Sequence, residues 1–284
     1  MNHVDKQLLD QKMECSNKHE NGFITESSLV FLQRLIKAKA SNDRSCKCWF
    51  YLGTQDNGEP FFTNLDTIHN MVLCGDPGRG KSTVLKLIIQ SMMLTLTPTD
   101  LQIVVIVRGY KEEYVFLNNS PFLYEQIMTD EDDHKDLFAR LNHELQNRNR
   151  ILYEDHSQNI YVYNQKHPND RIPHILIILD NADETIREET ENSFQRAGKS
   201  SHYANTFGFH WIISTQLITT WGMDSLLFKM PTKAALYPIE KEHADWLGFH
   251  KPQIITQPYQ LLLSSAFFDK EIVLKIPDIK LSTL

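Results

Sequence analysis

One stretch of the chain places glycines, a lysine and a hydroxyl side chain at the spacing of a phosphate-binding loop (P-loop). In order, its residues are Gly75, Asp76, Pro77, Gly78, Arg79, Gly80, Lys81, Ser82 and Thr83. Glycines let a backbone wrap around an anion, while its N–H groups and the start of the next helix point partial positive charge at phosphate. In such a loop Lys81 reaches the β- and γ-phosphates of a nucleotide, and the Ser82 hydroxyl binds Mg²⁺. We therefore predict a nucleotide with Mg²⁺ as the ligand of residues 75–83.

The segments on either side of the loop favour this interpretation. Apolar residues 71–74 precede it and are typical of a buried strand, and apolar residues at helical spacing follow over 84–92. The alternative is a glycine turn that only begins a helix. A strand, a glycine-rich turn and a helix in this order are the context in which the pattern forms a phosphate site.

A second apolar segment supplies a carboxylate. Residues 175–179 are all isoleucine or leucine, and the run ends at Asp180. Ligands of parallel sheets bind at the carboxyl ends of the strands, and nucleotide hydrolysis needs a carboxylate in the Mg²⁺ shell. We predict that Asp180 holds a magnesium-bound water, against the alternative of an aspartate that begins a turn.

Two amide side chains complete the predicted catalytic set. Asn181 directly follows Asp180, where many ATPases of this kind have a glutamate that deprotonates the attacking water. An amide can orient water but cannot accept its proton, and Asp183 or Glu184 is the alternative base. Gln216 ends the next apolar run and is expected to sense the γ-phosphate, the alternative being a loop amide that binds backbone groups. The predicted catalytic residues are Lys81, Asp180, Asn181 and Gln216.

The pattern along the rest of the chain predicts an α/β fold. Helices are expected at 27–40, 84–92 and 136–152, the last with its arginines, Arg140, Arg148 and Arg150, on a solvated face. Asn57-Gly58 predicts a hairpin turn. Alternating strands and helices predict a mostly parallel sheet with helices on both faces, in a domain of residues 49–284 that follows a leader and short helix in 1–48. Strands are expected at 48–52, 61–63, 71–74, 101–107, 174–179, 209–214, 233–237 and 259–263.

Composition limits the partners, the location and the metals that we expect for the chain. The 284 residues carry a net charge of −7, which argues against a strongly basic nucleic-acid binder, although a ring can line its pore with a few lysines. No apolar run approaches the ~20 residues that span a bilayer, so we expect a cytoplasmic protein without direct membrane insertion. The four cysteines are expected to be reduced thiols. The twelve histidines show no metal-binding spacing, and Mg²⁺ is the only metal expected.

Together these segments resemble the motor domain of the FtsK/SpoIIIE family, hexameric RecA-like ATPases that pump DNA. The resemblance covers roughly residues 49–248 and follows the order of the family's motifs. It implies a RecA-like P-loop NTPase fold, ATP as the nucleotide, double-stranded DNA as cargo and assembly into a ring of identical subunits. The segments that carry it are 52–60, 69–71, the P-loop, 118–123, 143–148, 163–164, 173–180, 196–199, 207–210 and 214–216.

Several positions depart from the family pattern. Asn181 replaces the family's glutamate, and Lys233 stands where the family has an arginine that can reach a neighbour's nucleotide. Lysine keeps the charge but lacks the planar fork of arginine. The segments 107–109 and 246–248 also lack the family's motifs. In these losses the chain resembles the ATPase modules of type VII secretion coupling proteins, and also short FtsK-like proteins of plasmids and integrative elements.

Three functions follow as alternatives. The first is an ATP-driven motor with weak hydrolysis that moves DNA. The second is a nucleotide-gated module, poor in hydrolysis, that belongs to a protein secretion machine at a membrane. The third is an α/β domain whose P-loop is a relic.

Overall fold

The computed structural model describes residues 48–108, 111–129, 132, 134–181, 204–216 and 230–277, together with Gln33 and Ile36. The predicted helix at 27–40, Asp183, Glu184 and the motif at 196–199 lie outside these residues, apart from the two named positions. In the part of the chain that the structure describes, no helix is both long and apolar enough to span a bilayer.

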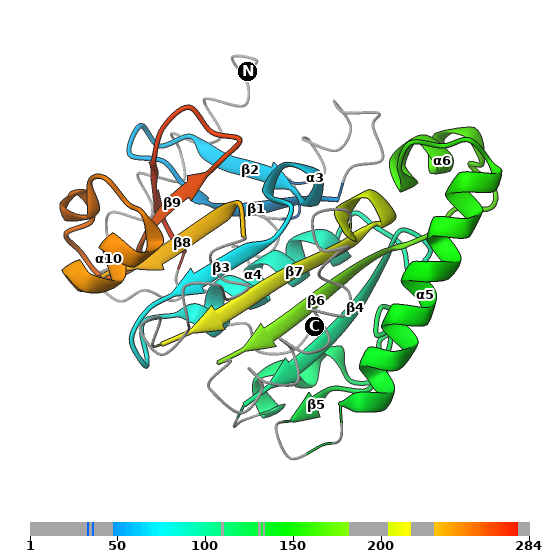
Figure 1. Ribbon diagram of the computed structural model, residues 1–284. Coiled ribbons are helices and arrows are strands. Elements are labelled where there is room, and N and C mark those ends of the chain that lie inside the picture. The colour runs from blue at the N-terminus through cyan, green and yellow to red at the C-terminus, as the bar shows by residue number, and fades with distance from the viewer. Residues whose placement is uncertain are drawn as a thin grey trace.

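A single sheet of ten strands runs through the described residues (Figure 1). The strands are β1 Trp49–Thr54, β2 Pro60–Asn64, β3 Met71–Cys74, β4 Leu101–Val107, β5 Met128–Thr129, β6 His174–Asp180, β7 Phe209–Thr215, β8 Thr232–Leu236, β9 Gln260–Ser265 and β10 Ile272–Lys275. The helices are α3 Leu65–Ile68, α4 Lys81–Met93, α5 Lys135–Glu154, α6 Ile160–Lys166 and α10 Lys241–Leu247, with 3₁₀ segments η1 Lys111–Leu117, η2 Asn205–Phe207 and η3 Pro252–Ile254.

The sheet has a parallel half and an antiparallel half. Its strand order is β2-β1-β10-β9-β8-β3-β7-β6-β4-β5, and every neighbouring pair from β8 to β5 is parallel. The pairs from β8 to β2 are antiparallel. The predicted hairpin is confirmed as β1 and β2, and the structure extends it through β10 and β9, of which β10 was not predicted.

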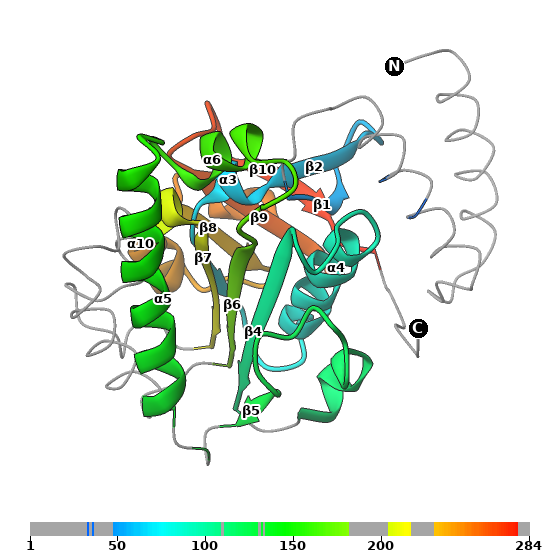
Figure 2. The same ribbon diagram turned by 90° about the vertical axis from the view of Figure 1, so that its right-hand side faces the viewer.

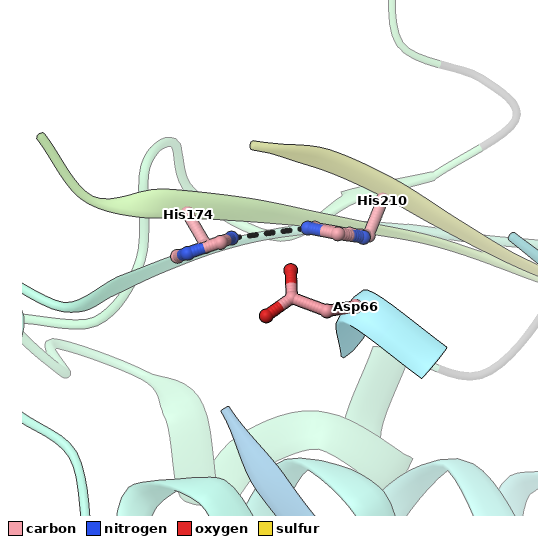
Figure 3. Close-up of side chains that lie close together, drawn as sticks. All are labelled: Asp66, His174 and His210. Carbon is pink, nitrogen blue, oxygen red and sulfur yellow. Dashed lines mark hydrogen bonds between the residues drawn. The ribbon is translucent and has the colours of Figure 1, made fainter. Parts of the chain in front are cut away.

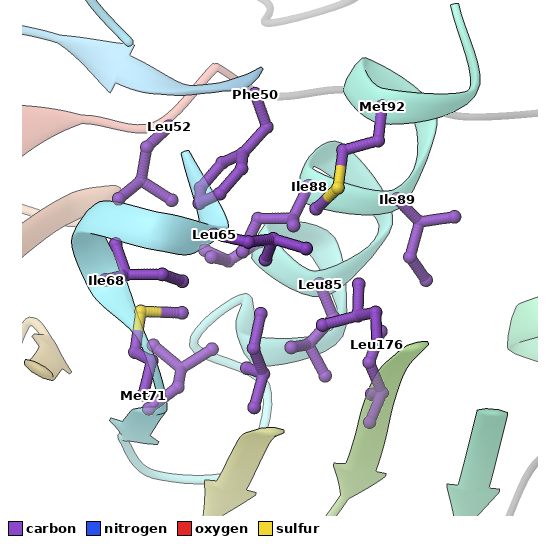
Figure 4. Packing of buried hydrophobic residues seen from close by; sticks show 14 of the residues in the cluster. Phe50, Leu52, Leu65, Ile68, Met71, Leu85, Ile88, Ile89, Met92 and Leu176 are labelled. Carbon is purple, nitrogen blue, oxygen red and sulfur yellow. The ribbon is translucent and has the colours of Figure 1, made fainter. Parts of the chain in front are cut away.

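Helices cover both faces of the sheet, as the sequence predicts. On one face α3 and α4 pack on the sheet through a core that includes Leu65, Leu85 and Leu176 (Figure 4). On the other face α5 and α10 pack through a second core that includes Leu141 and Leu247 (Figure 2). The inner parallel strands β3, β4 and β6 are largely apolar on both faces because both faces are buried.

The first and last strands of the described domain lie side by side. Thr54 of β1 pairs with Lys275 of β10. At Gly53 a Cβ atom would stand only 2.8 Å from the Lys275 carbonyl oxygen, closer than real Cβ contacts come. Glycine is therefore required here by the close approach of the two strands.

The prediction that Arg148 is solvated is wrong. Its side chain is 2% exposed and donates to Glu144 Oε1 at 2.8 Å and to the Phe207 carbonyl oxygen at 2.9 Å. Helical spacing explains the burial, since Arg148 lies seven residues after Leu141 and four before Leu152, on the apolar stripe of α5. Arg140 and Arg150 are exposed, as predicted.

Candidate nucleotide site

The predicted P-loop lies between a buried strand and a helix. All four residues of β3 are buried, and α4 begins at Lys81, directly after Gly80. Gly78 and Gly80 have φ angles of 71° and 99°, a left-handed conformation that glycine adopts without strain. No atom lies within 4 Å of a Cβ built on Gly78, so backbone conformation rather than crowding requires glycine there.

Lys81 is a buried cation held by the start of the loop. Its side chain is only 7% exposed, and its ammonium donates to the carbonyl oxygens of Gly75 at 2.7 Å and Asp76 at 3.1 Å. A buried ammonium must be hydrogen-bonded, and these carbonyls meet that need. Ser82 and Thr83 lie half-buried on the first turn of α4, while the loop tip is exposed at Pro77, Gly78 and Arg79.

Asp180 is buried at the carboxyl end of β6, where both of its oxygens accept hydrogen bonds. Ser214 Oγ donates to Oδ1 at 2.5 Å, and the Tyr114 hydroxyl donates to Oδ2 at 2.7 Å. Burial, followed by the nearby Asp180 charge, raises the pKa of Tyr114 well above its ordinary value. The phenol therefore stays protonated and serves as a fixed donor to the carboxylate.

The segment that carries Tyr114 is tied to the P-loop helix. Tyr114 lies within η1 and is fully buried, and the preceding residue, Glu113, forms a 2.6 Å ion pair with Lys86 of α4. The Tyr114 contact thus links Asp180 to an element that also contacts the helix after the P-loop.

Strand β7 connects the two halves of the site. It lies between β3 and β6 (Figure 1). The Thr215 carbonyl oxygen accepts from the Gly75 N–H at 3.3 Å, while the neighbouring Ser214 hydroxyl contacts Asp180 and accepts from the Asn181 N–H at 2.8 Å. The carboxyl ends of three adjacent parallel strands therefore carry the P-loop, the tip of β7 and Asp180, as the sequence predicts.

The two predicted catalytic amides contact each other. Gln216 Nε2 donates to Asn181 Oδ1 at 2.6 Å. Asn181 has a φ of 60°, a conformation in which asparagine and aspartate are enriched among residues other than glycine. Asn181 is thus suited to its backbone as well as to its partner, and the pair is placed to orient a polar group beside Asp180.

Lys233 lies away from this chain's own P-loop. It is the second residue of β8 and pairs with Val72, whereas Leu236, at the other end of β8, packs against Gly75. Its side chain is half-buried, and desolvation lowers the pKa of its ammonium group. Lys233 therefore takes no part in the site formed by the P-loop and Asp180 of the same chain.

The donor set at this edge suits a magnesium nucleotide. Glycines with left-handed backbones and the start of a 13-residue helix suit phosphate, and Lys81 supplies a compact cation. A hydroxyl at Ser82 and a carboxylate at Asp180 are the oxygen ligands that Mg²⁺ prefers. A carboxylate has about four acceptor positions, so Asp180 keeps capacity beyond its two present donors.

Sequence reasoning missed Tyr114 and the role of Ser214. Ser214 had a usable signal in the sequence, because it ends the apolar run at 209–214 and lies two residues before Gln216. Tyr114 had none, since it follows Lys111, Glu112 and Glu113 in a stretch without helical or strand periodicity.

The part of the chain that contains these residues matches a known protein family. Residues 32–220, about two thirds of the chain, match the family model described as "FtsK/SpoIIIE family". DNA translocase FtsK of Sporosarcina ureae is 25% identical over 200 residues, covering 66% of this chain and 25% of the relative. The chain thus spans about a quarter of that relative's length.

Solved structures with the same fold come from secretion and conjugation proteins. The cytoplasmic domain of the Thermomonospora curvata type VII secretion ATPase EccC has a TM-score of 0.69 at 16% identity, covering 82% of this chain and 29% of that one. The pCW3 conjugation coupling protein TcpA, in its monomer form with ATPγS, has a TM-score of 0.61 at 16% identity, covering 81% and 65%. These likenesses show a RecA-like P-loop fold. With the family match over two thirds of its length, the chain belongs to the FtsK/SpoIIIE family.

Proposed function

We propose that the chain is an ATP-binding motor domain that uses Mg–ATP to move DNA, and that it hydrolyses ATP slowly. The observation that carries the proposal is the shared edge of β3, β7 and β6. There the P-loop and the buried Asp180 are joined through Ser214 and Thr215. If the phosphate loop had no buried carboxylate two strands away, the site would support nucleotide binding but not hydrolysis.

Each residue has a distinct task in this proposal. The loop of residues 75–83 binds the phosphates, and Lys81 exchanges a backbone carbonyl for phosphate oxygens. Ser82 and Asp180 hold Mg²⁺, which neutralises charge on the phosphates when it is bound. Gln216 and Asn181 orient water beside the γ-phosphate.

The slow hydrolysis follows from the chemistry of Asn181. Its amide oxygen accepts a hydrogen bond from Gln216 but cannot take up a proton at neutral pH. A general base typically contributes 10²–10⁴-fold to such a reaction, so its absence reduces turnover without affecting phosphate binding.

The named relatives favour DNA as cargo, since the curated proteins that match two thirds of this chain are DNA translocases. We propose that the domain acts in the cytoplasm as a ring of identical subunits, free or docked to a larger membrane machine, in which Lys233 faces a neighbouring subunit. The second candidate is a hydrolysis-poor module of a protein secretion machine, which Asn181 and Lys233 favour.

The test compares Lys81→Ala with Lys270→Ala, a matched control in the exposed turn between β9 and β10. ATP binding is measured by calorimetry with Mg²⁺, and turnover is measured with and without double-stranded DNA. We expect Lys81→Ala to abolish binding and Lys270→Ala to leave it unchanged. Turnover that DNA stimulates supports the motor, whereas tight binding with turnover at the Lys81→Ala level supports the gated module. Absence of binding in the unmodified chain overturns both proposals.

A further inference from the structure

Three side chains from distant parts of the sequence converge on the α3 side of the sheet. They are Asp66 of α3, His174 at the start of β6 and His210 of β7, and their ligand atoms all lie within 4.8 Å of one another (Figure 3). Both histidines lie near the amino ends of their strands, whereas the P-loop and Asp180 lie at the carboxyl ends. The cluster is therefore separate from the nucleotide site.

The strand register brings the two imidazoles together. His210 is paired with Leu176, two residues after His174, so both rings project from the same face of the sheet. His174 Nδ1 lies 3.0 Å from His210 Nε2. His174 is 4% exposed and His210 is fully buried, which fixes both rings within the packed core.

The hydrogen bond of His210 to the backbone sets its tautomer. His210 Nδ1 lies 3.2 Å from the His69 carbonyl oxygen, which can only accept, so Nδ1 carries the proton. In the neutral ring Nε2 then has a lone pair that points toward His174 and Asp66. Metal-binding histidines are commonly oriented in this way, by a carbonyl that accepts from the second ring nitrogen.

The surroundings hold this arrangement in place. Burial lowers the pKa of His174 and of His210. Asn205 Nδ2 contacts His69 Nδ1 at 2.8 Å, and the His69 ring stacks on Phe267. The carbonyl that orients His210 thus belongs to a residue that is itself anchored.

Asp66 supplies a negatively charged ligand, which the two imidazoles lack. Its carboxylate points toward the gap between the two facing ring nitrogens (Figure 3). The residue is half-buried, so Asp66 keeps contact with solvent while both imidazoles are buried. A carboxylate also balances part of the charge of a divalent ion, which two neutral rings cannot do.

We propose that Asp66, His174 and His210 form a binding site for a divalent transition metal, with Zn²⁺ as the ion that fits best. Two imidazoles and one carboxylate form a ligand set that suits Zn²⁺ and not Mg²⁺, which prefers oxygen. When the ion binds, the proton on His174 Nδ1 moves to Nε2 of the same ring, so both facing nitrogens become ligands. Three protein ligands leave one position for water.

The site would join the segment before the P-loop strand to the middle of the sheet. Asp66 precedes β3 by a few residues, β6 ends in Asp180, and Gln216 directly follows β7. The ion would bind only the folded chain and would therefore stabilise it.

The test titrates the untagged, chelator-treated full chain with Zn²⁺ by calorimetry and follows the melting temperature. Co²⁺ serves as a second probe, since its visible spectrum reports nitrogen and oxygen ligands. Asp66→Asn keeps the shape of the side chain and removes its charge, and Asp269→Asn, at an exposed turn, is the matched control. We expect one Zn²⁺ per chain, a raised melting temperature, and affinity at least tenfold weaker in Asp66→Asn but unchanged in Asp269→Asn.

His174→Gln serves as a second variant if Asp66→Asn does not fold, and we expect it to lose the Co²⁺ spectrum. Equal Zn²⁺ affinity in the unmodified chain and in the folded variant overturns the proposal, because surface histidines would then account for binding. Absence of a melting shift with Zn²⁺ overturns it as well.

Discussion

The Tyr114 hydroxyl donates a 2.7 Å hydrogen bond to Asp180 Oδ2, and both residues are buried. Tyr114 belongs to η1, which follows β4, whereas Asp180 ends β6. The contact makes Tyr114 a positioning residue for the carboxylate that we propose to hold Mg²⁺.

Tyr114→Phe removes this donor and keeps the ring. We expect a loss of about 1.5–3 kcal/mol in the free energy of unfolding, the usual range for a hydrogen bond to a charged group. We also expect the Mg²⁺ concentration for half-maximal ATP binding to rise about tenfold, as for other residues that orient metal ligands. Urea unfolding and Mg²⁺ titration at fixed ATP measure the two effects. Tyr153→Phe, at an 81% exposed position, is the control. Loss of stability with unchanged Mg²⁺ dependence would show that the Tyr114 hydrogen bond stabilises the fold without orienting Asp180 for Mg²⁺.

Asn181→Asp adds a carboxylate without straining the backbone, because aspartate also adopts a φ near 60°. We expect turnover to rise at least tenfold, since the new carboxylate can accept a proton from water. Asn181→Gly keeps the backbone conformation without a side chain and should not raise turnover. Asn181→Glu is a poorer probe, because glutamate is strained at the φ of 60° found at this position and the strain would mask a gain in turnover. Steady-state ATP hydrolysis measures the series, and equal rates in Asn181→Asp and the unmodified chain would show that the missing base is not limiting.

Arg148 and Arg150 provide a matched pair on α5, since each forms an ion pair with a glutamate four residues away. Arg148→Ala leaves the Phe207 carbonyl oxygen and Glu144 without their donor and opens a cavity beside Phe209. We expect a loss of about 3 kcal/mol in unfolding free energy. Arg150→Ala, on the exposed face, should cost less than about 1 kcal/mol. Thermal or urea unfolding distinguishes them, and equal losses would contradict the buried role of Arg148.

Cys74 predicts a loss of stability at alkaline pH. Burial raises the pKa of its thiol to about 12 from an ordinary value of 9. Above pH 9 the unfolded chain releases this proton and the folded chain does not, so unfolding becomes more favourable as pH rises toward 12. Between pH 8 and 10 this group should cost about 1.4 kcal/mol. Urea unfolding at both pH values compares the unmodified chain with Cys74→Ala and so isolates the contribution of the thiol. An equal change of unfolding free energy with pH in the two proteins would contradict the prediction.

The sequence predicted β3, β4 and β6 well because each is a nearly continuous apolar run, whereas the two residues of β5 were not predicted. The run at 175–179 and the glycines of the P-loop also placed Asp180 and Lys81 at one edge. The antiparallel half of the sheet was harder to predict, since β10 has only four residues and forms only through its pairing with other strands. Arg148 was misplaced because a charged residue on an apolar stripe is recognised only when its partners are known.

The three side chains that we propose as metal ligands could not be recognised from sequence patterns for a similar reason. Asp66, His174 and His210 are separated by more than thirty residues from one another, and only the register of β6 and β7 brings the histidines together. Spacing rules detect ligands on one helix or one loop, not ligands on neighbouring strands.

The pairing of β1 with β10 has a consequence for how the chain folds. Residues 49–64 of the hairpin are synthesised well before residues 272–275, yet only β10 completes the inner edge of β1. Contacts of such long range form slowly. Until then Gly53 and its neighbours present an open strand edge, so β10 is the strand that joins the β1–β2 hairpin to the other described strands.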